Sequence, residues 1–296
     1  VGDNLGYYGC MAVACENGGR RPMPMHLRFW SPDAPGFTSE NDELEAVFGV
    51  IISATGGRGI FIYDRGGDNI EFYRYFLREN VDFIVRLKSR YVISWKRNLL
   101  CDDLAEQCVM RYADTITFNS HGKKVRVELN YGVVPVRLPD ISDKLLHMVV
   151  VKGFGQKPMM LLTTLARTTT RKDLWQVVTA YITRWRVEET IRHVKQAYNL
   201  EDIRLLRYRH LKNMAAIVLA TAYFCMTWIG NSDKRAFIAK SITDASLRIH
   251  ELPEFHFYAI ADGIRMLLSR CGRWSGFGKD DIDDEPDLFE FFNCDD

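Results

Sequence analysis

The sequence lacks the cysteine pattern of a small, covalently stabilised domain. Its seven cysteines are an odd number, and no two of them form a C-x-x-C pair. Disulfide frameworks and structural zinc sites both depend on paired cysteines, so this pattern argues against either. We expect the thiols to be reduced and mostly buried.

Long hydrophobic runs are also absent. The longest apolar stretch, 214–229, is shorter than the roughly 20 residues that a membrane-spanning helix needs, and it predicts a buried helix instead. No basic start followed by an apolar segment and a small-residue cleavage site is found at Val1. We therefore expect a cytoplasmic protein that has no membrane partner.

Charge is balanced over the whole chain but not along it. The 296 residues carry a net charge of +1, and 47% of them are hydrophobic, enough to bury one large core or two modest ones. The segment 280–296 holds nine acidic residues and no Lys or Arg, so residues 1–279 carry a net +10. A basic body with an acidic tail fits a protein that binds polyanions, although such a tail is more often a solvated chain end.

Strands and helices alternate over the first ninety residues, which predicts an α/β fold. Ser39 is placed to cap the first helix, and Glu16-Asn17-Gly18-Gly19 is typical of a hairpin turn. We expect strands over 7–15, 22–30, 59–63 and 81–88, and helices over 40–54 and 68–79.

Residues 89–165 are rich in short β segments, and helical periodicity returns after Thr170. It predicts long helices over 171–198 and 208–229, followed by weaker ones over 233–249 and 255–270. The chain is thus expected to contain a first core part (1–88), a β-rich insertion (89–165), a second core part (166–230) and a helical C-terminal region with an acidic tail (231–296).

One predicted helix carries a polar stripe. At about 100° per residue, Tyr181, Arg184, Glu188 and Lys195 fall within about 60° of one another and so share a face. On helix geometry alone, an ordinary solvated face is the favoured explanation, because Glu188 has arginines at i−4 and i+4.

A second candidate is Asp64, which directly follows an apolar strand and precedes Gly66-Gly67. The ends of strands are where α/β sheets present side chains to ligands. An aspartate in this position is also common as a simple turn residue.

Together the two segments resemble the DDE transposases of bacterial insertion sequences, in the insertion-sequence-four family. The family signature Tyr-x2-Arg-x3-Glu-x6-Lys is complete as Tyr181, Arg184, Glu188 and Lys195, and the family's Asp-Arg-Gly segment matches residues 64–66. The basic strand 83–88 and the β-rich insertion are also similar. The resemblance covers about residues 1–230.

This resemblance implies a ribonuclease-H-like core in which three carboxylates hold two Mg²⁺ or Mn²⁺ ions for phosphoryl transfer. Asp64 and Glu188 match two of the three ligands. Arg184 and Lys195 match residues that grip phosphates of the transposon end, and Tyr181 matches a nearby hydrogen-bond donor.

Two further cations, Arg86 and Lys88, stand two residues apart on the strand expected over 81–88, so they share one face. They would extend the phosphate contacts made by Arg184 and Lys195. Alternatively, they are edge-strand charges that discourage aggregation.

The implied function is a DNA transposase that cleaves transposon ends and transfers them to target DNA, as a homodimer on double-stranded DNA in the bacterial nucleoid. The pattern departs from the family in two respects: the first strand with its catalytic aspartate is expected upstream of Val1, and so is the family's DNA-recognition region. We therefore expect this chain alone to be nearly inactive on DNA. The alternative is a catalytically incomplete DNA-binding or dimerising fragment.

Overall fold

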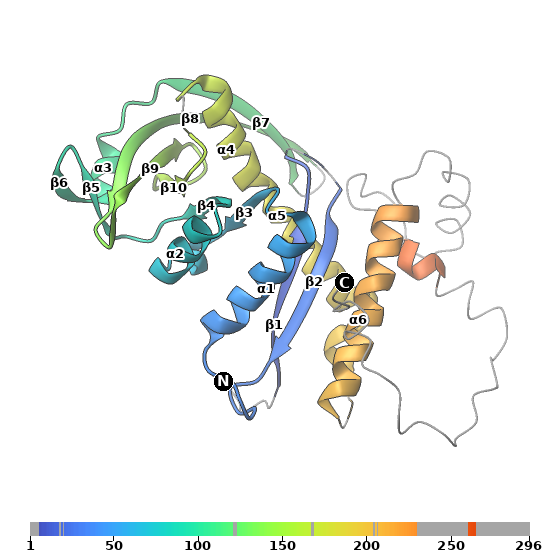
Figure 1. Cartoon of the computed structure of the whole chain (residues 1–296). Coiled ribbons are helices and arrows are strands. Elements are labelled where there is room, and N and C mark those ends of the chain that lie inside the picture. The colour runs from blue at the N-terminus through green and yellow to red at the C-terminus, as the bar shows by residue number, and fades with distance from the viewer. Residues whose placement is uncertain are drawn as a thin grey trace, which may run out of the picture. The chain divides into compact units, whose positions relative to one another are not determined.

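The computed structural model describes residues 6–17, 19, 21–120, 123–166, 169–203, 205, 207–229 and 260–264 (Figure 1). The chain folds as two compact units. Unit 1 comprises Val1–Glu43 and Trp185–Asp296, and unit 2 comprises Leu44–Arg184.

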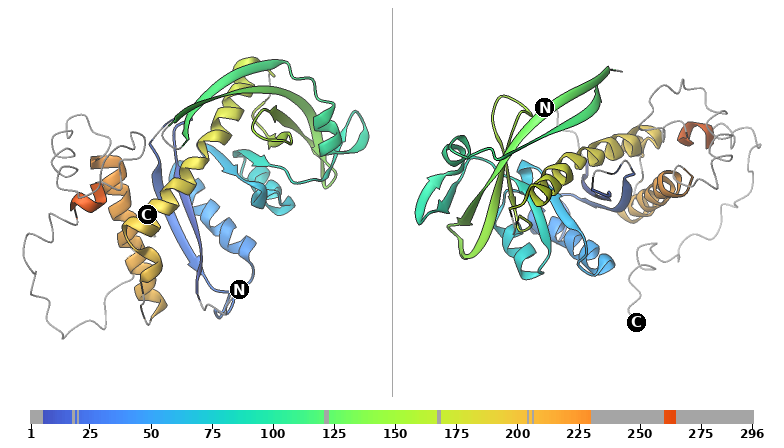
Figure 2. Two further views of the ribbon diagram at one scale, coloured as in Figure 1. Left: turned by 180° about the vertical axis from the view of Figure 1, so that it is seen from behind. Right: turned by 90° about the horizontal axis from the view of Figure 1, so that it is seen from above.

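Unit 1 is built on the expected hairpin, which is confirmed. Strands β1 (Tyr8–Ala14) and β2 (Met23–Trp30) pair antiparallel, with an irregularity between Ala12 and Val13. Helix α5 (Trp185–Ala197) packs on β1, and α6 (Tyr208–Tyr223) packs along β2 (Figure 2). A short turn, η2 (Leu200–Asp202), joins them, and Val194, Val218 and Ala222 form the small core beneath.

Helix α1 (Glu40–Thr55) confirms the helix expected over 40–54, and the boundary of the two units falls within it. Its first turn is capped by Ser39, whose Oγ accepts a hydrogen bond from the Asp42 amide at 3.1 Å. It ends at Gly56 and Gly57, which have φ of 62° and 71°. Glycine adopts this left-handed conformation without steric cost.

Unit 2 contains a mixed sheet that begins with two parallel strands. Strands β3 (Ile60–Tyr63) and β4 (Asp82–Arg86) are parallel and are joined by η1 (Arg65–Gly67) and α2 (Ile70–Arg78). Strand β4 also pairs antiparallel with β10 (Met159–Thr163), so the β segments after residue 89 extend the same sheet. The remaining elements are β5 (Tyr91–Ser94), β6 (Arg97–Leu100), α3 (Cys101–Glu106), β7 (Tyr112–Ser120), β8 (Lys123–Leu138) and β9 (Ile141–Lys152).

The strand order is β3-β4-β10-β9-β8-β5-β6, and β7 pairs with β8 off this path. Helix α4 (Arg171–Thr183) packs against β8 and β9 across the curved sheet (Figure 1). It buries Leu174, Val177 and Val178 against Leu129 and Val149. The result is a mixed α/β unit, as the alternation of strands and helices predicts.

The structure differs from the sequence-based expectation in the long helix over 171–198. That helix is divided: α4 ends at Thr183 and α5 begins at Trp185. The Thr183 hydroxyl donates to the Thr179 carbonyl oxygen at 2.8 Å, and the Arg184 amide donates to the Tyr181 carbonyl three residues back. Both interactions lie at the point of division, and bonds of these kinds compete with the regular i to i−4 pattern.

Other elements differ at their ends. Strand β4 ends at Arg86, so Lys88 lies beyond the strand to which the sequence pattern assigns it. The helix expected to continue to residue 229 becomes π-helical over Phe224–Ile229. The weaker helices and the acidic tail expected over 231–296 lie outside the described residues, except for 260–264, which are helical. No helix in the described ranges is both long and apolar enough to cross a membrane.

Candidate functional site

Asp64 stands where β3 ends and the backbone turns toward α2. Its Oδ1 accepts a hydrogen bond from the Gly66 amide at 2.8 Å, so it caps the short helix η1. The turn needs glycine at 67, because a Cβ there would lie 2.5 Å from the Cβ of Tyr63. The Asp64 side chain is exposed, and its Oδ2 has no hydrogen bond to any described residue. Asp64 is therefore a turn residue with one carboxylate oxygen left for a ligand.

Arg86 and Lys88 lie at the same edge of the sheet as Asp64. Strands β3 and β4 are parallel, with Tyr63 opposite Val85, so the carboxyl ends of the two strands adjoin. Arg86 ends β4 and is half-buried, whereas Lys88 is exposed. Leu87 between them is buried, and Lys88 lies just beyond the end of β4.

Asp68 is a structural residue of this turn that the sequence pattern does not single out. Its carboxylate is 2% exposed and forms an ion pair with Arg90. Its two oxygens also accept hydrogen bonds from the Tyr73 hydroxyl at 2.9 Å and from the Lys88 amide at 2.7 Å. Desolvation, followed by the neighbouring Asp68 charge, raises the pKa of Tyr73. Asp68 therefore ties the turn after β3 to the segment after β4.

Glu188 and Lys195 lie together in a groove along α5. This groove, called here the α5 groove, has a volume of about 340 Å³. It is lined by Glu188, Ile191, Arg192, Lys195, Gln196 and Glu201. The Lys195 ammonium pairs with the Glu201 carboxylate, with Nζ to Oε1 at 2.7 Å. The spacing of seven residues thus places Glu188 and Lys195 on one helix face, as the sequence pattern predicts.

Tyr181 and Arg184 belong to unit 2, at the end of α4. The Tyr181 side chain is 3% exposed within the core of that unit, and its hydroxyl has no hydrogen-bond partner among the described residues. The Arg184 guanidinium lies over the Tyr181 ring, 5.6 Å from its centroid. The structure therefore places Tyr181 with Arg184 in one unit, and Glu188 with Lys195 in the other.

The family comparison covers both segments. A family model described as the transposase DDE domain matches residues 38–225, which include Asp64 and the Tyr-Arg-Glu-Lys residues. The chain belongs to this transposase family. No curated relative matches the sequence. Membership in the family makes DNA the substrate class and transposition the process in which such domains act.

Transposases with this domain generally use divalent metal ions, and the donors found here suit them in kind. Asp64 and Glu188 offer carboxylate oxygens, which Mg²⁺ and Mn²⁺ prefer to nitrogen or sulfur ligands. Within the described ranges, no three His, Cys, Asp or Glu side chains cluster closely enough to hold a metal ion.

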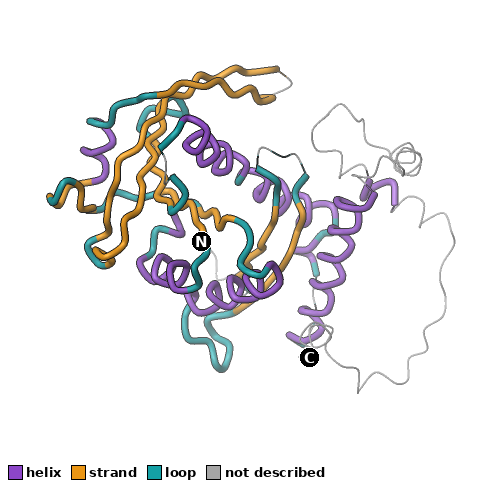
Figure 3. Tube along the Cα trace, turned by 45° about the horizontal axis from the view of Figure 1, so that its top comes forward, coloured by secondary structure: helices purple, strands orange, loops and turns teal. Residues whose placement is uncertain are grey.

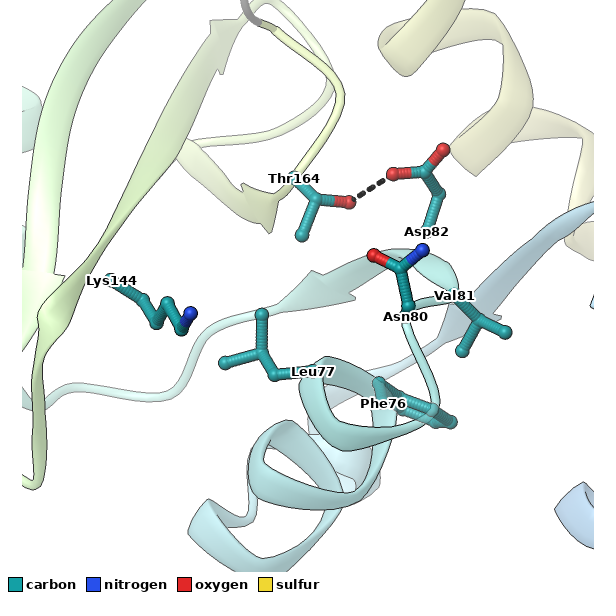
Figure 4. Close-up of a pocket in the computed structure, with 7 residues that line it drawn as sticks. All are labelled: Phe76, Leu77, Asn80, Val81, Asp82, Lys144 and Thr164. Atoms are coloured by element: carbon teal, nitrogen blue, oxygen red, sulfur yellow. Dashed lines mark hydrogen bonds between the residues drawn. The ribbon is translucent and has the colours of Figure 1, made fainter.

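A second cavity of this transposase domain lies at the opposite end of the parallel strands, where β4 begins. It also has a volume of about 340 Å³, and its polar lining comes from Asn80, Asp82, Lys144 and Thr164 (Figure 4). The Thr164 hydroxyl donates to the Asp82 carboxylate at 2.7 Å. Asp82 begins β4 whereas Asp64 follows the end of the parallel β3, so this cavity includes none of the predicted site residues.

Proposed function

We propose that this transposase, of the insertion-sequence-four type, cleaves DNA at the ends of a mobile element and joins the freed 3′-hydroxyl to target DNA. The proposal is supported by one observation within a member of this family: the Asp64 carboxylate is exposed where the two parallel strands β3 and β4 end. The α5 groove adds a second carboxylate, Glu188, and the cation Lys195, both of which line it.

In this proposal Asp64 and Glu188 are two of the carboxylates that hold divalent ions in a ribonuclease-H-like core. Bound Mg²⁺ or Mn²⁺ would supply positive charge to the attacking and leaving oxygens of the phosphodiester. Asp64 is suited to this role because its Oδ1 is held by the Gly66 amide while Oδ2 remains open to a ligand.

The cations of the signature would hold the DNA backbone. Lys195 is exposed and can exchange its contact with Glu201 for a phosphate, while Arg184 offers a guanidinium for a two-pronged phosphate contact. Arg86 and Lys88 would extend the backbone contact at the edge near Asp64. Tyr181 would support Arg184, whose guanidinium lies over its ring. It would also donate the phosphate hydrogen bond that the family resemblance implies.

The partners in this proposal are double-stranded DNA at the element ends and at the target, both reached in the bacterial nucleoid. Two copies of the chain would act together, since two ends must be joined to one target. A protein that binds the ends but neither binds metal nor cleaves DNA would instead be a DNA-binding or dimerising fragment.

Iron-directed cleavage of the polypeptide tests the metal ligands directly. Fe²⁺ with ascorbate and peroxide generates hydroxyl radicals at a Mg²⁺ site and cuts the chain beside its ligands. We expect cuts near residues 64 and 188 that excess Mg²⁺ suppresses, and that Asp64→Asn or Glu188→Gln weakens at both positions. Asp140→Asn and Glu189→Gln, which remove carboxylates of the same units, serve as controls.

Strand cleavage tests the reaction itself. The substrate is a plasmid that carries the DNA flanking the coding sequence on both sides, incubated with the protein and Mn²⁺. Nicks at fixed flanking positions that disappear in Asp64→Asn support a transposase. Retarded DNA without nicks and without iron-directed cuts would favour the non-catalytic alternative and overturn the proposal.

A further inference from the structure

The chain turns after α5, and this turn brings a second carboxylate to the α5 groove. Asn199 adopts a left-handed conformation with φ of 50°, and the short helix η2 follows it. The Asp202 amide donates to the Asn199 carbonyl oxygen at 3.0 Å and closes the turn. In Figure 3 the chain passes from α5 through this turn toward α6, and both helices lie beside the β1–β2 hairpin. The turn therefore lies at the end of the α5 groove.

Apolar residues fix the position of Glu201 within this turn. Leu200 and Ile203 pack against the small core of unit 1. Glu201 stands between them in the sequence, and 68% of its side chain is exposed. Packing before and after Glu201 thus holds the backbone in place without burying the carboxylate.

The Glu201 carboxylate meets Lys195 in the groove. Both residues line it, and Nζ of Lys195 lies 2.7 Å from Oε1 of Glu201. The Lys195 side chain is 44% exposed, so the pair is open to solvent. Exposed ion pairs contribute little to the free energy of unfolding. An anion that approaches Lys195 can therefore displace the carboxylate easily.

The formal charges along the α5 groove cancel. Two carboxylates, Glu188 and Glu201, balance two cations, Arg192 and Lys195. Glu188 is the proposed metal ligand, so its charge is compensated when the ion binds. Glu201 is then the groove carboxylate whose charge opposes an incoming phosphate.

We propose that Glu201 is an intramolecular competitor for the phosphate contact of Lys195. In the DNA-free protein its carboxylate occupies the Lys195 ammonium, and a phosphate of the DNA backbone must displace it. Glu201 thereby lowers the affinity of the transposase for DNA. This inference rests on the proposed function in that Lys195 contacts DNA, and it needs neither metal binding nor cleavage.

The competing explanation is that the ion pair only holds the turn after α5 in place. In that case Glu201→Gln would loosen the turn, and binding of DNA would weaken or stay the same. A competitor predicts the opposite sign, because its removal leaves Lys195 available to the phosphate. The direction of the change in affinity therefore separates the two roles.

The experiment measures binding of the full chain to a fluorescent duplex that carries the DNA flanking the coding sequence, by anisotropy at low salt. Exposed ion pairs favour the paired state by up to about fivefold, so Glu201→Gln should bind about two- to sixfold more tightly than the wild type. The gain should shrink as salt is added, since salt also weakens the pair.

Two further variants sharpen the test. In a Lys195→Gln background, Glu201→Gln should change the affinity by less than about twofold, because no ammonium is left to release. Glu189→Gln is the matched control: Glu189 belongs to α5 and pairs with Arg186 at 2.7 Å, but it does not line the groove. Its substitution should also change the affinity by less than about twofold.

Unchanged or weaker binding by Glu201→Gln would overturn the competitor proposal. An equal gain in the Lys195→Gln background would do the same, because the effect would not pass through Lys195. If iron-directed cuts near residues 64 and 188 are present in the same preparation, either result leaves the proposed function standing. Loss of those cuts while Glu201→Gln still binds more tightly would instead remove the catalytic proposal alone.

Discussion

Asp64 and Asp68 flank the same pair of glycines, yet the structure predicts opposite consequences for their substitution. The perturbation is Asp→Asn at each position, which keeps the shape of the side chain and removes its charge. Asp68 is 2% exposed and accepts hydrogen bonds from three donors, whereas Asp64 is exposed and accepts one. The matched substitution therefore separates a structural carboxylate from a candidate ligand.

The expected loss in the free energy of unfolding follows from the groups that Asp68→Asn leaves without a charged partner. It removes the charge that compensates the partly buried Arg90 and turns an amide nitrogen toward the Tyr73 hydroxyl or the Lys88 amide. Breaking one partner of a buried pair costs about 3 to 5 kcal/mol, and Arg90 is 21% exposed, so we expect about 3 kcal/mol. Asp64→Asn should cost less than about 0.5 kcal/mol, because an asparagine oxygen still accepts from Gly66.

Urea unfolding followed by circular dichroism measures both values. Asp68→Asn should lower the midpoint without changing the slope, since the folded state keeps its surface. The double variant with Arg90→Gln should regain at least about 1 kcal/mol, because it no longer contains an uncompensated charge. Equal losses for Asp64→Asn and Asp68→Asn would refute this account of the turn.

Three other predictions follow from local geometry. Gly132→Ala should destabilise the protein by about 1 to 3 kcal/mol in the same assay, because its Cβ would lie 2.2 Å from a backbone carbonyl oxygen, while Gly155→Ala, with open space around it, should change little. Trp95 has φ of 48° in the turn between β5 and β6, so Trp95→Gly should raise the melting temperature, because glycine adopts this conformation without strain. Hydrogen bonding from Arg171 lowers the pKa of Asp114, so its stabilising contribution is present above the ordinary value of 3.8 and is lost as the pH falls through the lowered value; Arg171→Gln should reduce this acid-dependent loss.

Local signals predicted several elements because their causes are local. The Ser39 cap and the Gly56-Gly57 end define α1, and a short apolar run defines β3. The Asp64 turn was also predictable, because an aspartate at a strand end followed closely by two glycines is typical of a turn.

Other features depend on contacts between distant residues. Nothing in a sequence window indicates that β10 pairs with β4, because the two strands are more than seventy residues apart. Asp68 is similar, since its partners Lys88 and Arg90 lie in another segment.

The sequence by itself indicated the transposase family, through the signature spacing of Tyr181, Arg184, Glu188 and Lys195 and the Asp-Arg-Gly segment at Asp64. Only the tertiary structure decided which side chains are accessible. It buries Tyr181, exposes Asp64 and pairs Lys195 with Glu201. The physical reason is that burial and pairing are set by what packs against a residue, and its neighbours in space come from distant parts of the chain.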